Sequence, residues 1–381
     1  MLKVGLLTPR STLFPHLSTD WLSGLKNFLK HRGVANDFSL SIDNIGFGTD
    51  EQDIYSKAEK LLLQEDADVV VLFADNYAAE MLTPLFSATN KLLLVVNFGA
   101  NFPDNQEPPP TVIYHSLNFC FHAGLTGKLA ASAKSKNAIN AVSYYDGGYR
   151  QCFCMLNGHQ SNGGVPVFNH ITHLRLSEFT LTPIAEFIQN NPGEATMLCL
   201  FSGDQAERFY QDIGTILEKH PFPLFVSPMM LDETLKLPME MSGINASGYI
   251  PWHSSLDNRA NTLFKEIFTK ATGKSVNYFS LLGWETGMLL AMIREKYTGN
   301  NAAETVVLLN QEVINSPRGS LKVDANTHQI YGPSYLAVIR GTGSIALEGE
   351  MKMPDEEWQL FSAIKLGVGE SSSWRNTYLC I

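Results

Sequence analysis

The sequence lacks both a long hydrophobic run and a block of basic residues. Its longest apolar stretches, residues 69–74 and 92–96, fall far short of the roughly 20 residues that a membrane-spanning helix requires. Lys and Arg number 28 against 38 Asp and Glu, which gives a net charge of −10. Because the apolar runs are short, we expect no direct membrane insertion. Because an acidic surface repels the phosphate backbone, we also expect no nucleic-acid binding.

The amino terminus also lacks an export signal. The first residues, from Met1 to Pro9, read at once as a buried strand that runs into a loop, with no charged region, apolar segment or cleavage site. The chain is therefore either cytoplasmic or a mature periplasmic form from which the signal has been removed. Five scattered cysteines, an odd number, do not decide between these alternatives.

Motifs for catalysis and for nucleotide binding are absent or incomplete. No HExxH motif, no GxSxG motif and no locally supported Ser/His/Asp arrangement occurs. Gly341-Thr342-Gly343 begins a weak dinucleotide fingerprint, but the following residues are typical of a returning strand, which favours a hairpin turn. Gly273-Lys274-Ser275 resembles the end of a P-loop, yet Phe268 stands where the first glycine is required. We therefore expect a protein without enzymatic activity and without a cofactor.

One group of thiols and imidazoles has the chemistry of a metal site. Its members are Cys152, Cys154, His159, His170 and His173. On a helix the two cysteines would point about 200° apart, and on a strand the last two histidines would face opposite sides. Neither pair can chelate a metal easily, so we expect structural roles and no bound metal.

Short apolar strands alternate with amphipathic helices through the first half of the chain, which is the pattern of parallel βαβ units. Residues 69–74 are apolar at nearly every position, as expected of a central parallel strand covered on both faces. A second set of strands and helices begins near Phe119. Three helical patterns then follow, at about residues 258–271, 278–297 and 303–315, before two final strand-like stretches. The sequence thus predicts two α/β lobes.

Polar and aromatic residues gather in the loops after the predicted strands, where ligands bind in open α/β sheets. The candidate ligand-binding residues are Asp75, Asn76, Tyr77, Asn97, Asn101, Phe102, Tyr145, Tyr149, Asp204 and Trp252. Such a mixture can orient a small polar ligand by hydrogen bonds while aromatic faces enclose it. The alternative for any one polar residue is an ordinary role in a turn or helix cap. Trp252 can equally pack a connection between the lobes.

The order of these segments resembles the type I periplasmic-binding-protein family, and within it the branched-chain amino acid (Leu/Ile/Val) substrate-binding branch of ABC transporters. The matching segments are residues 3–9, 93–101, 145–149, 283–290 and 316–333. The resemblance implies an α/β fold of two Rossmann-like lobes, with parallel sheets flanked by helices. It also implies three crossings, near residues 114–119, 247–253 and 328–333.

These crossings divide the chain into two discontinuous lobes. Lobe 1 would comprise residues 1–117 and 252–329, and lobe 2 residues 118–251 and 330–381. The resemblance further implies a periplasmic receptor that closes its lobes around an amino acid or a related amide or carboxylate. Its partners would be this small-molecule ligand and the membrane permease of an ABC importer. A cytoplasmic ligand-sensing regulator of the same fold is the alternative, and an enzyme that uses the cleft is a third hypothesis.

The resemblance also assigns roles to loops. In the family, a serine-rich loop of lobe 1 holds the ligand carboxylate, while an acidic residue and a tyrosine of lobe 2 hold the ammonium. Here Asp75 stands in the first of these loops, where its charge would repel a carboxylate. Asn101 replaces the usual threonine, and Tyr149 matches the family tyrosine. The acidic position falls on Met229 or Met230, so the ammonium partner would be Asp204 or Asp232.

Overall fold

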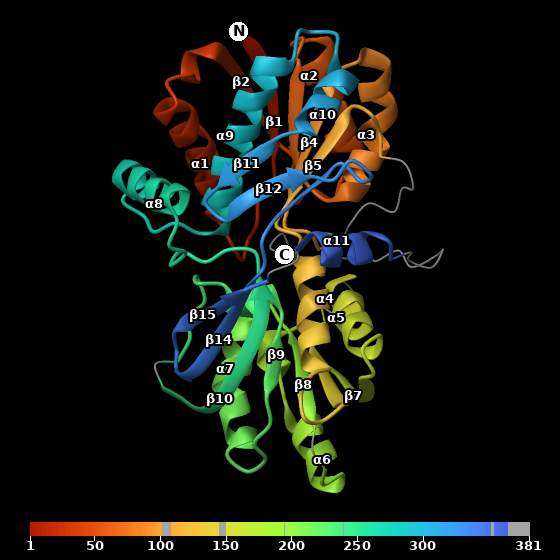
Figure 1. Cartoon of the computed structure of the whole chain (residues 1–381), viewed down its shortest axis with the longest axis vertical. Helices are drawn as coiled ribbons and strands as arrows, with labels where there is room; N and C mark the ends of the chain where they lie inside the picture. The colour runs from red at the N-terminus through yellow and green to blue at the C-terminus, as the bar shows by residue number, and fades with distance from the viewer. Residues whose placement is uncertain (101–107, 145–149, 194, 239, 352–353, 365–381) are drawn as a thin grey trace. The chain divides into compact units, whose positions relative to one another are not determined.

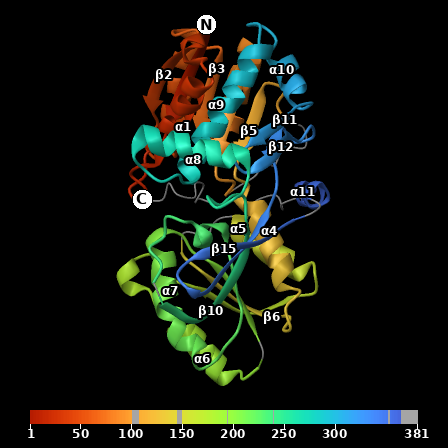
Figure 2. The same cartoon turned by 60° about the vertical axis from the view of Figure 1, so that its left-hand side comes forward.

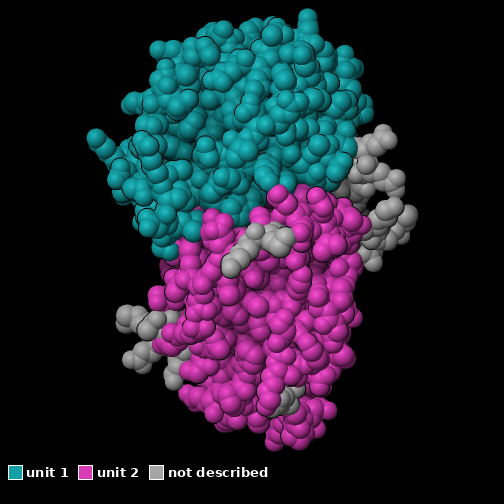
Figure 3. Space-filling model, in the orientation of Figure 1, with its two compact units in different colours: residues 1–117, 254–333, 378–381 teal, residues 118–253, 334–377 magenta. Residues whose placement is uncertain are grey.

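The computed structural model describes residues 1–100, 108–144, 150–193, 195–238, 240–351 and 354–364 (Figure 1). The described chain divides into two compact units, which Figure 3 distinguishes by colour. Among the described residues, unit 1 contains Met1–Leu117 and Ser254–Pro333, and unit 2 contains Asn118–His253 and the residues from 334 to 364. The sequence had placed the second and third boundaries after residues 251 and 329. In the described part, no helix has the length and apolar character of a membrane span.

Unit 1 is built on an eight-stranded sheet with the order β11-β12-β13-β5-β4-β3-β1-β2. Five strands form a parallel series: β1 (Leu2–Thr8), β2 (Phe38–Asn44), β3 (Val69–Phe73), β4 (Leu92–Asn97) and β5 (Val112–Ser116). A short strand β13 (Gln329–Tyr331) pairs in parallel with β5. An antiparallel hairpin of β11 (Val313–Ser316) and β12 (Gly319–Val323) completes that edge. The sheet is therefore mixed rather than wholly parallel.

Helices cover both faces of this sheet, as Figures 1 and 2 show. On one face, α2 (Glu51–Leu63) and α3 (Asn76–Thr89) pack their apolar sides on Leu7 of β1 and on alternate residues of β3 and β4. On the other, α1 (Leu17–His31) places Trp21 5.5 Å from the ring of Phe73. Because β3 and β4 are buried on both faces, every residue in them is apolar except the last residue of β4.

Three further helices of unit 1 come from the later part of the chain: α8 (Arg259–Thr272), α9 (Tyr278–Lys296) and α10 (Ala302–Leu309). Glycines let α9 approach α1 closely. A Cβ atom added to Gly283 would lie 1.9 Å from the carbonyl oxygen of Trp21, and one added to Gly24 would lie 2.2 Å from that of Ser280. Larger residues at these two positions would force the helices apart.

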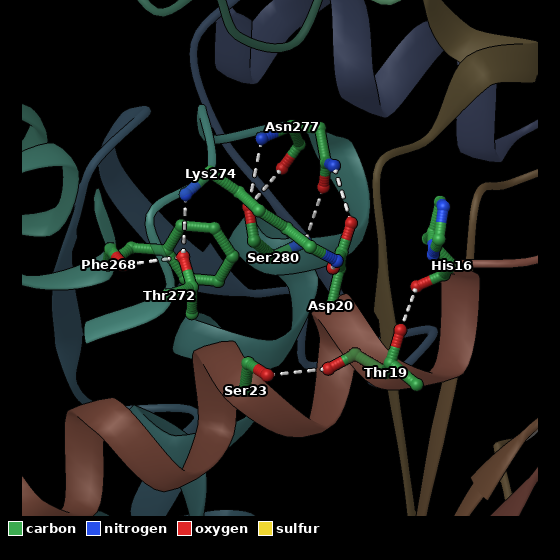
Figure 4. Close-up of polar contacts among 9 residues, drawn as sticks. All are labelled: His16, Thr19, Asp20, Ser23, Phe268, Thr272, Lys274, Asn277 and Ser280. Atoms are coloured by element: carbon green, nitrogen blue, oxygen red, sulfur yellow. Dashed lines mark hydrogen bonds and ion pairs between the residues drawn. The ribbon is translucent and has the colours of Figure 1, made fainter. Parts of the chain in front are cut away.

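A buried carboxylate joins the first turns of α1 and α9 (Figure 4). Asp20 of α1 accepts from Lys274 Nζ at 2.7 Å and from Asn277 Nδ2 at 2.9 Å. Asn277 also caps α9 through a capping box with Ser280. Since α1 is the helix that follows β1 and its loop, these bonds help to fix the start of the helix near the carboxyl edge of the sheet. They also show that Gly273-Lys274-Ser275 follows the end of α8, in a context unlike a P-loop.

Unit 2 repeats the architecture with a seven-stranded sheet of order β15-β14-β10-β9-β8-β6-β7. Its parallel strands are β6 (Asn137–Val142), β7 (Val165–Ile171), β8 (Thr196–Leu200), β9 (Leu224–Val226) and β10 (Glu240–Ile250). The strands β14 (Tyr335–Thr342) and β15 (Ile345–Glu350) add an antiparallel hairpin beside β10. The predicted hairpin turn is confirmed, because β14 ends at Thr342 and pairs antiparallel with β15, which begins at Ile345.

The helices of unit 2 are α4 (Phe119–Ala130), α5 (Arg150–Gln160), α6 (Thr182–Asn190), α7 (Gly203–Leu217) and α11 (Pro354–Ser362). A close glycine contact joins α4 to α5, as one joins α1 to α9 in unit 1. A Cβ atom on Gly127 would lie 1.9 Å from the carbonyl oxygen of Met155, and one on Gly158 would lie 2.1 Å from that of Gly124. Each unit is thus held together by one tight helix pair beside its sheet.

One predicted element was wrong in extent, and the strand β10 was missed. The helix expected at residues 303–315 ends at Leu309, because Val313–Ser316 pairs with β12 as a strand. The strand β10 was not predicted as a whole. Its pairing with β9 and β14 supplies the hydrogen bonds that the sequence pattern does not reveal. The expected overall fold, two α/β lobes flanked by helices, is confirmed.

Candidate functional site

The parallel part of each sheet has a topological switch point, where successive strands are added first on one side of a strand and then on the other. In unit 1, β1 lies between β2 and β3, so the chain moves to one side of β1 and then to the other. In unit 2, β6 lies between β7 and β8 in the same way. Ligands of doubly wound sheets bind outside the carboxyl ends of the strands at such a switch point. The loops after β1, β3, β6 and β8 are therefore the candidate binding loops.

In unit 1 the structure brings together three of the predicted residues, Asp75, Asn76 and Asn97. Asp75 is the N-cap of α3, and its Oδ1 accepts the N–H of Asn76 at 2.7 Å. Asn97 ends β4, and its Nδ2 donates to Asn76 Oδ1 at 2.9 Å. Its own Oδ1 accepts the N–H of Gly99 at 2.9 Å. These side chains are 5–6% exposed, so the array is both polar and almost fully enclosed.

The geometry explains why these residue types occur here. A buried carboxylate or amide is tolerated only where hydrogen bonds replace its water. Asp75 satisfies an N–H group that the start of α3 leaves free, and Asn97 links the ends of β3 and β4. Gly99 has a φ of +77°, which a residue with a side chain rarely adopts. Tyr77, in the first turn of the same helix, is 44% exposed.

Aromatic rings gather around the residue that follows Asn97. Phe98, the residue after Asn97, has its ring centre 5.6 Å from that of Phe73 and 5.7 Å from that of Phe279. Phe14, in the loop after β1, lies 5.7 Å from Phe279 on its other side. The sequence analysis did not single out Phe14 or Phe279. They belong to segments far apart in the chain, and no local pattern indicates that they meet.

The loop after β1 is a second feature that the sequence analysis missed. Arg10 donates its backbone N–H to the carbonyl oxygen of Gly46 at 2.7 Å. Ser11 Oγ accepts the N–H of Phe14 at 3.1 Å. The guanidinium carbon of Arg10 lies 4.5 Å from the centre of the Phe47 ring. The only signal in the sequence was the position of this loop, directly after the first predicted strand.

Unit 2 presents fewer described side chains at its switch point. Asp204 lies in the first turn of α7 and is exposed, whereas its neighbour Gln205 is turned inward. Gln205 Oε1 accepts from Thr172 Oγ1 at 2.8 Å, and its Nε2 donates to the carbonyl oxygen of His173 at 3.2 Å. Gln205 thus holds the start of α7 against the segment after β7. Asp204 is left facing outward at the helix N-terminus, which favours a negative charge.

Other predicted residues of unit 2 are buried or lie outside the described residues. Trp252 is 2% exposed, which fits its alternative role in packing next to a crossing. Met229 and Met230 are buried in the short helix Pro228–Leu231. Asp232 is also buried, and its Oδ1 accepts from the backbone and hydroxyl of Thr234 at 2.9 and 2.8 Å. Tyr145, Tyr149, Asn101 and Phe102 lie outside the described residues.

A buried ionic network supports the end of β5, next to the first crossing. Arg318 Nε donates to Glu285 Oε1 at 2.8 Å, and Arg318 Nη2 donates to the carbonyl oxygen of Ser116 at 3.0 Å. Ser316 Oγ also donates to Glu285. His115 Nε2 lies 3.3 Å from the other carboxylate oxygen of Glu285. Burial lowers the pKa of His115 to about 4 despite the opposing effect of Glu285, so the imidazole is neutral near pH 7.

The candidate metal-site residues also have structural surroundings. Asn140 Nδ2 donates to Cys152 Sγ at 3.7 Å, and His170 Nε2 lies 2.8 Å from the carbonyl oxygen of Thr180. His173 lies beyond the end of β7 and faces Glu178 across 3.5 Å. Within the described ranges, no three His, Cys, Asp or Glu side chains are grouped as metal ligands would be.

A family model described as "Periplasmic binding protein" matches residues 1–344. The chain belongs to the periplasmic binding protein family. Proteins of this family bind solutes and do not catalyse reactions, so this binding protein is not an enzyme. No match was found among curated proteins.

Several solved structures share the fold of this binding protein. A solute-binding protein of an ABC transporter from Rhodopseudomonas palustris, in complex with benzoate, is 22% identical, with a TM-score of 0.70. The alignment covers 92% of this chain and 96% of that one. An ABC transporter substrate-binding protein from Sphaerobacter thermophilus is 14% identical, with a TM-score of 0.77 and coverages of 93% and 98%. An ABC-type branched-chain amino acid transporter from R. palustris is 13% identical, with a TM-score of 0.69 and coverages of 99% and 100%.

Proposed function

We propose that this protein is the solute-binding receptor of an ABC importer and that it works in the periplasm. In this proposal, the binding loops of both units contact one small polar ligand, and the units close around it by a hinge motion. The receptor then delivers the ligand to the membrane permease. The main support for this proposal is the Asp75–Asn76–Asn97 array, in which enclosed, hydrogen-bonded polar groups lie next to the switch point of unit 1.

The ligand class has two candidates within this proposal. One is an amino acid or a related amide, in line with the resemblance to the branched-chain amino acid branch and with a solved structure named for such a transporter. The other is an aromatic acid. It is supported by the benzoate complex of a similar protein and by the chain of rings from Phe14 through Phe279 to Phe98. Aromatic rings favour flat apolar ligands through offset or edge-on contacts.

A ligand survey tests the proposal. Small molecules are extracted from the purified full chain and identified by mass spectrometry. In parallel, thermal unfolding is followed with an amino acid panel, their amides, benzoate and hydroxybenzoates. A ligand at 100 times its Kd stabilises the folded state by about 2.7 kcal/mol, so we expect a clear rise in Tm for at least one chemical class. If nothing is extracted and no compound raises the Tm, the proposed function is wrong.

A further inference from the structure

Arg10 occupies the loop between β1 and α1, which flanks the switch point of unit 1. The backbone of this loop is fixed on both sides of the residue. Ile45 donates to the carbonyl oxygen of Thr8 at 2.9 Å, and Arg10 itself donates to that of Gly46 at 2.7 Å. Ser18 Oγ donates to the carbonyl oxygen of Pro9. The start of the Arg10 side chain is therefore held in one place at the carboxyl edge of the sheet.

Within the described residues, the side chain of Arg10 has no acidic partner. Of the other arginines of unit 1, Arg294 pairs with Asp37 at 3.1 Å and Arg318 with Glu285 at 2.8 Å, whereas Arg32 and Arg259 form no ion pair within the described residues. Arg10 is exposed, and its contact within the described chain is the ring of Phe47, 4.5 Å below the guanidinium carbon. No carboxylate among the described residues forms an ion pair with it. A guanidinium stacked on a ring still points its N–H groups outward in the plane, where they can bind a carboxylate at two points.

The carboxylate of Asp75 makes the N-terminus of α3 unfavourable for an anionic ligand group. A helix N-terminus next to a switch point attracts negative groups, but at α3 the carboxylate of Asp75 already accepts the N–H of Asn76. A second carboxylate there would meet a like charge in an enclosed environment, where repulsion is strong. The loop after β3 therefore disfavours an anionic ligand group, whereas the loop after β1 offers a guanidinium that no described carboxylate neutralises.

We infer that Arg10 is a specificity-determining residue that binds a carboxylate group of the ligand. This inference rests on the proposed function and assigns the anionic end of the ligand to the loop after β1 rather than to the loop after β3. Phe47 holds the guanidinium in one orientation, which reduces the entropy lost when the ligand binds. The Asp75–Asn76–Asn97 array then faces the uncharged or cationic part of the ligand.

The test compares ligands that differ only in this charge. Binding of benzoate and benzamide, and of leucine and leucinamide, is measured by isothermal titration calorimetry on the full chain and on Arg10→Gln. In whichever pair binds the wild type, we expect the variant to bind the carboxylate about 10- to 100-fold more weakly, as for loss of a charge-assisted hydrogen bond. The amide member should change by less than about threefold. Arg10→Lys, which keeps the charge but not the planar fork, should fall between.

Arg32→Gln is the matched control, because Arg32 is an exposed arginine at the opposite end of α1. Its affinities should equal those of the wild type. If Arg10→Gln weakens the carboxylate and the amide equally, or neither, the inference is wrong while the proposed function stands. If the wild type binds none of the four probes and carries no co-purified molecule, the proposed function fails and this inference with it.

Discussion

The two units present their candidate binding loops in different ways. In unit 1, Asp75, Asn76 and Asn97 are buried and bonded to one another, so the polar edge is part of the folded core. In unit 2, Asp204 faces outward from the first turn of α7, while Gln205 beside it supplies the structural bonds. Unit 1 therefore has a preorganised edge, whereas in unit 2 the exposed and the structural roles belong to different residues. Substitutions of these unit 1 residues should lower both ligand affinity and the free energy of unfolding. Substitution of Asp204 in unit 2 should lower ligand affinity alone.

The largest contrast is expected between two arginines. Arg318→Met in unit 1 removes the partner of a buried Glu285 carboxylate, and breaking such a pair costs about 3–5 kcal/mol of unfolding free energy. Arg340→Met in unit 2 removes an exposed ion pair with Glu348, which costs less than about 1 kcal/mol. Urea denaturation measures both. Similar losses in the two variants would show that the buried network adds no special stability to unit 1.

A smaller effect concerns pH. The pKa of His115 is lowered to about 4 in the folded protein, mainly by burial, from an ordinary value of 6.5. Between these values the unfolded state binds the proton and the folded state does not, so stability falls as the pH falls from about 6.5 to about 4. The contribution is on the order of 3 kcal/mol at most.

Denaturation curves measured across this pH range test that expectation. His115→Asn should flatten the pH dependence of the unfolding free energy, whereas His220→Asn, at an exposed position of unit 2, should leave it as in the wild type. Burial also lowers the pKa of His159 and His170 in unit 2, so some slope remains in either variant. An unchanged slope in His115→Asn would mean that this imidazole already takes up its proton in the folded state.

The sequence predicts the parts of the site that are local in the chain. Asp75 and Asn97 were identified because each directly follows or ends an uninterrupted apolar strand. Arg10 was missed because a single charge after Pro9 forms no pattern. Phe279 was missed because its contact with Phe14 joins segments about 265 residues apart, and only the packing of α9 against α1 brings them together.

The fold was predictable to a similar extent, and its incorrect predictions have a similar cause. Parallel strands buried on both faces leave a clear apolar signature, which identified β3 and β4. The helix predicted through residue 315 was too long because Val313 and Ile314 continue its apolar spacing, although their partners are in β12. Residues 240–250 carry no strong pattern, and their strand depends on neighbours on both sides. Pairing between distant segments decides such cases.

We propose that loops of both units bind the ligand, and affinities measured on one variant of each unit give the sharpest test. Calorimetry is performed on Asn97→Ala, Asp204→Ala and the exposed control Asn36→Ala, with the ligand found in the survey. We predict that the first two weaken binding by about tenfold or more and that the control does not. Only Asn97→Ala should also lose about 1–3 kcal/mol of unfolding free energy, because it removes the buried hydrogen bond from Asn97 Nδ2 to Asn76 Oδ1. Wild-type affinity in both site variants would contradict the account.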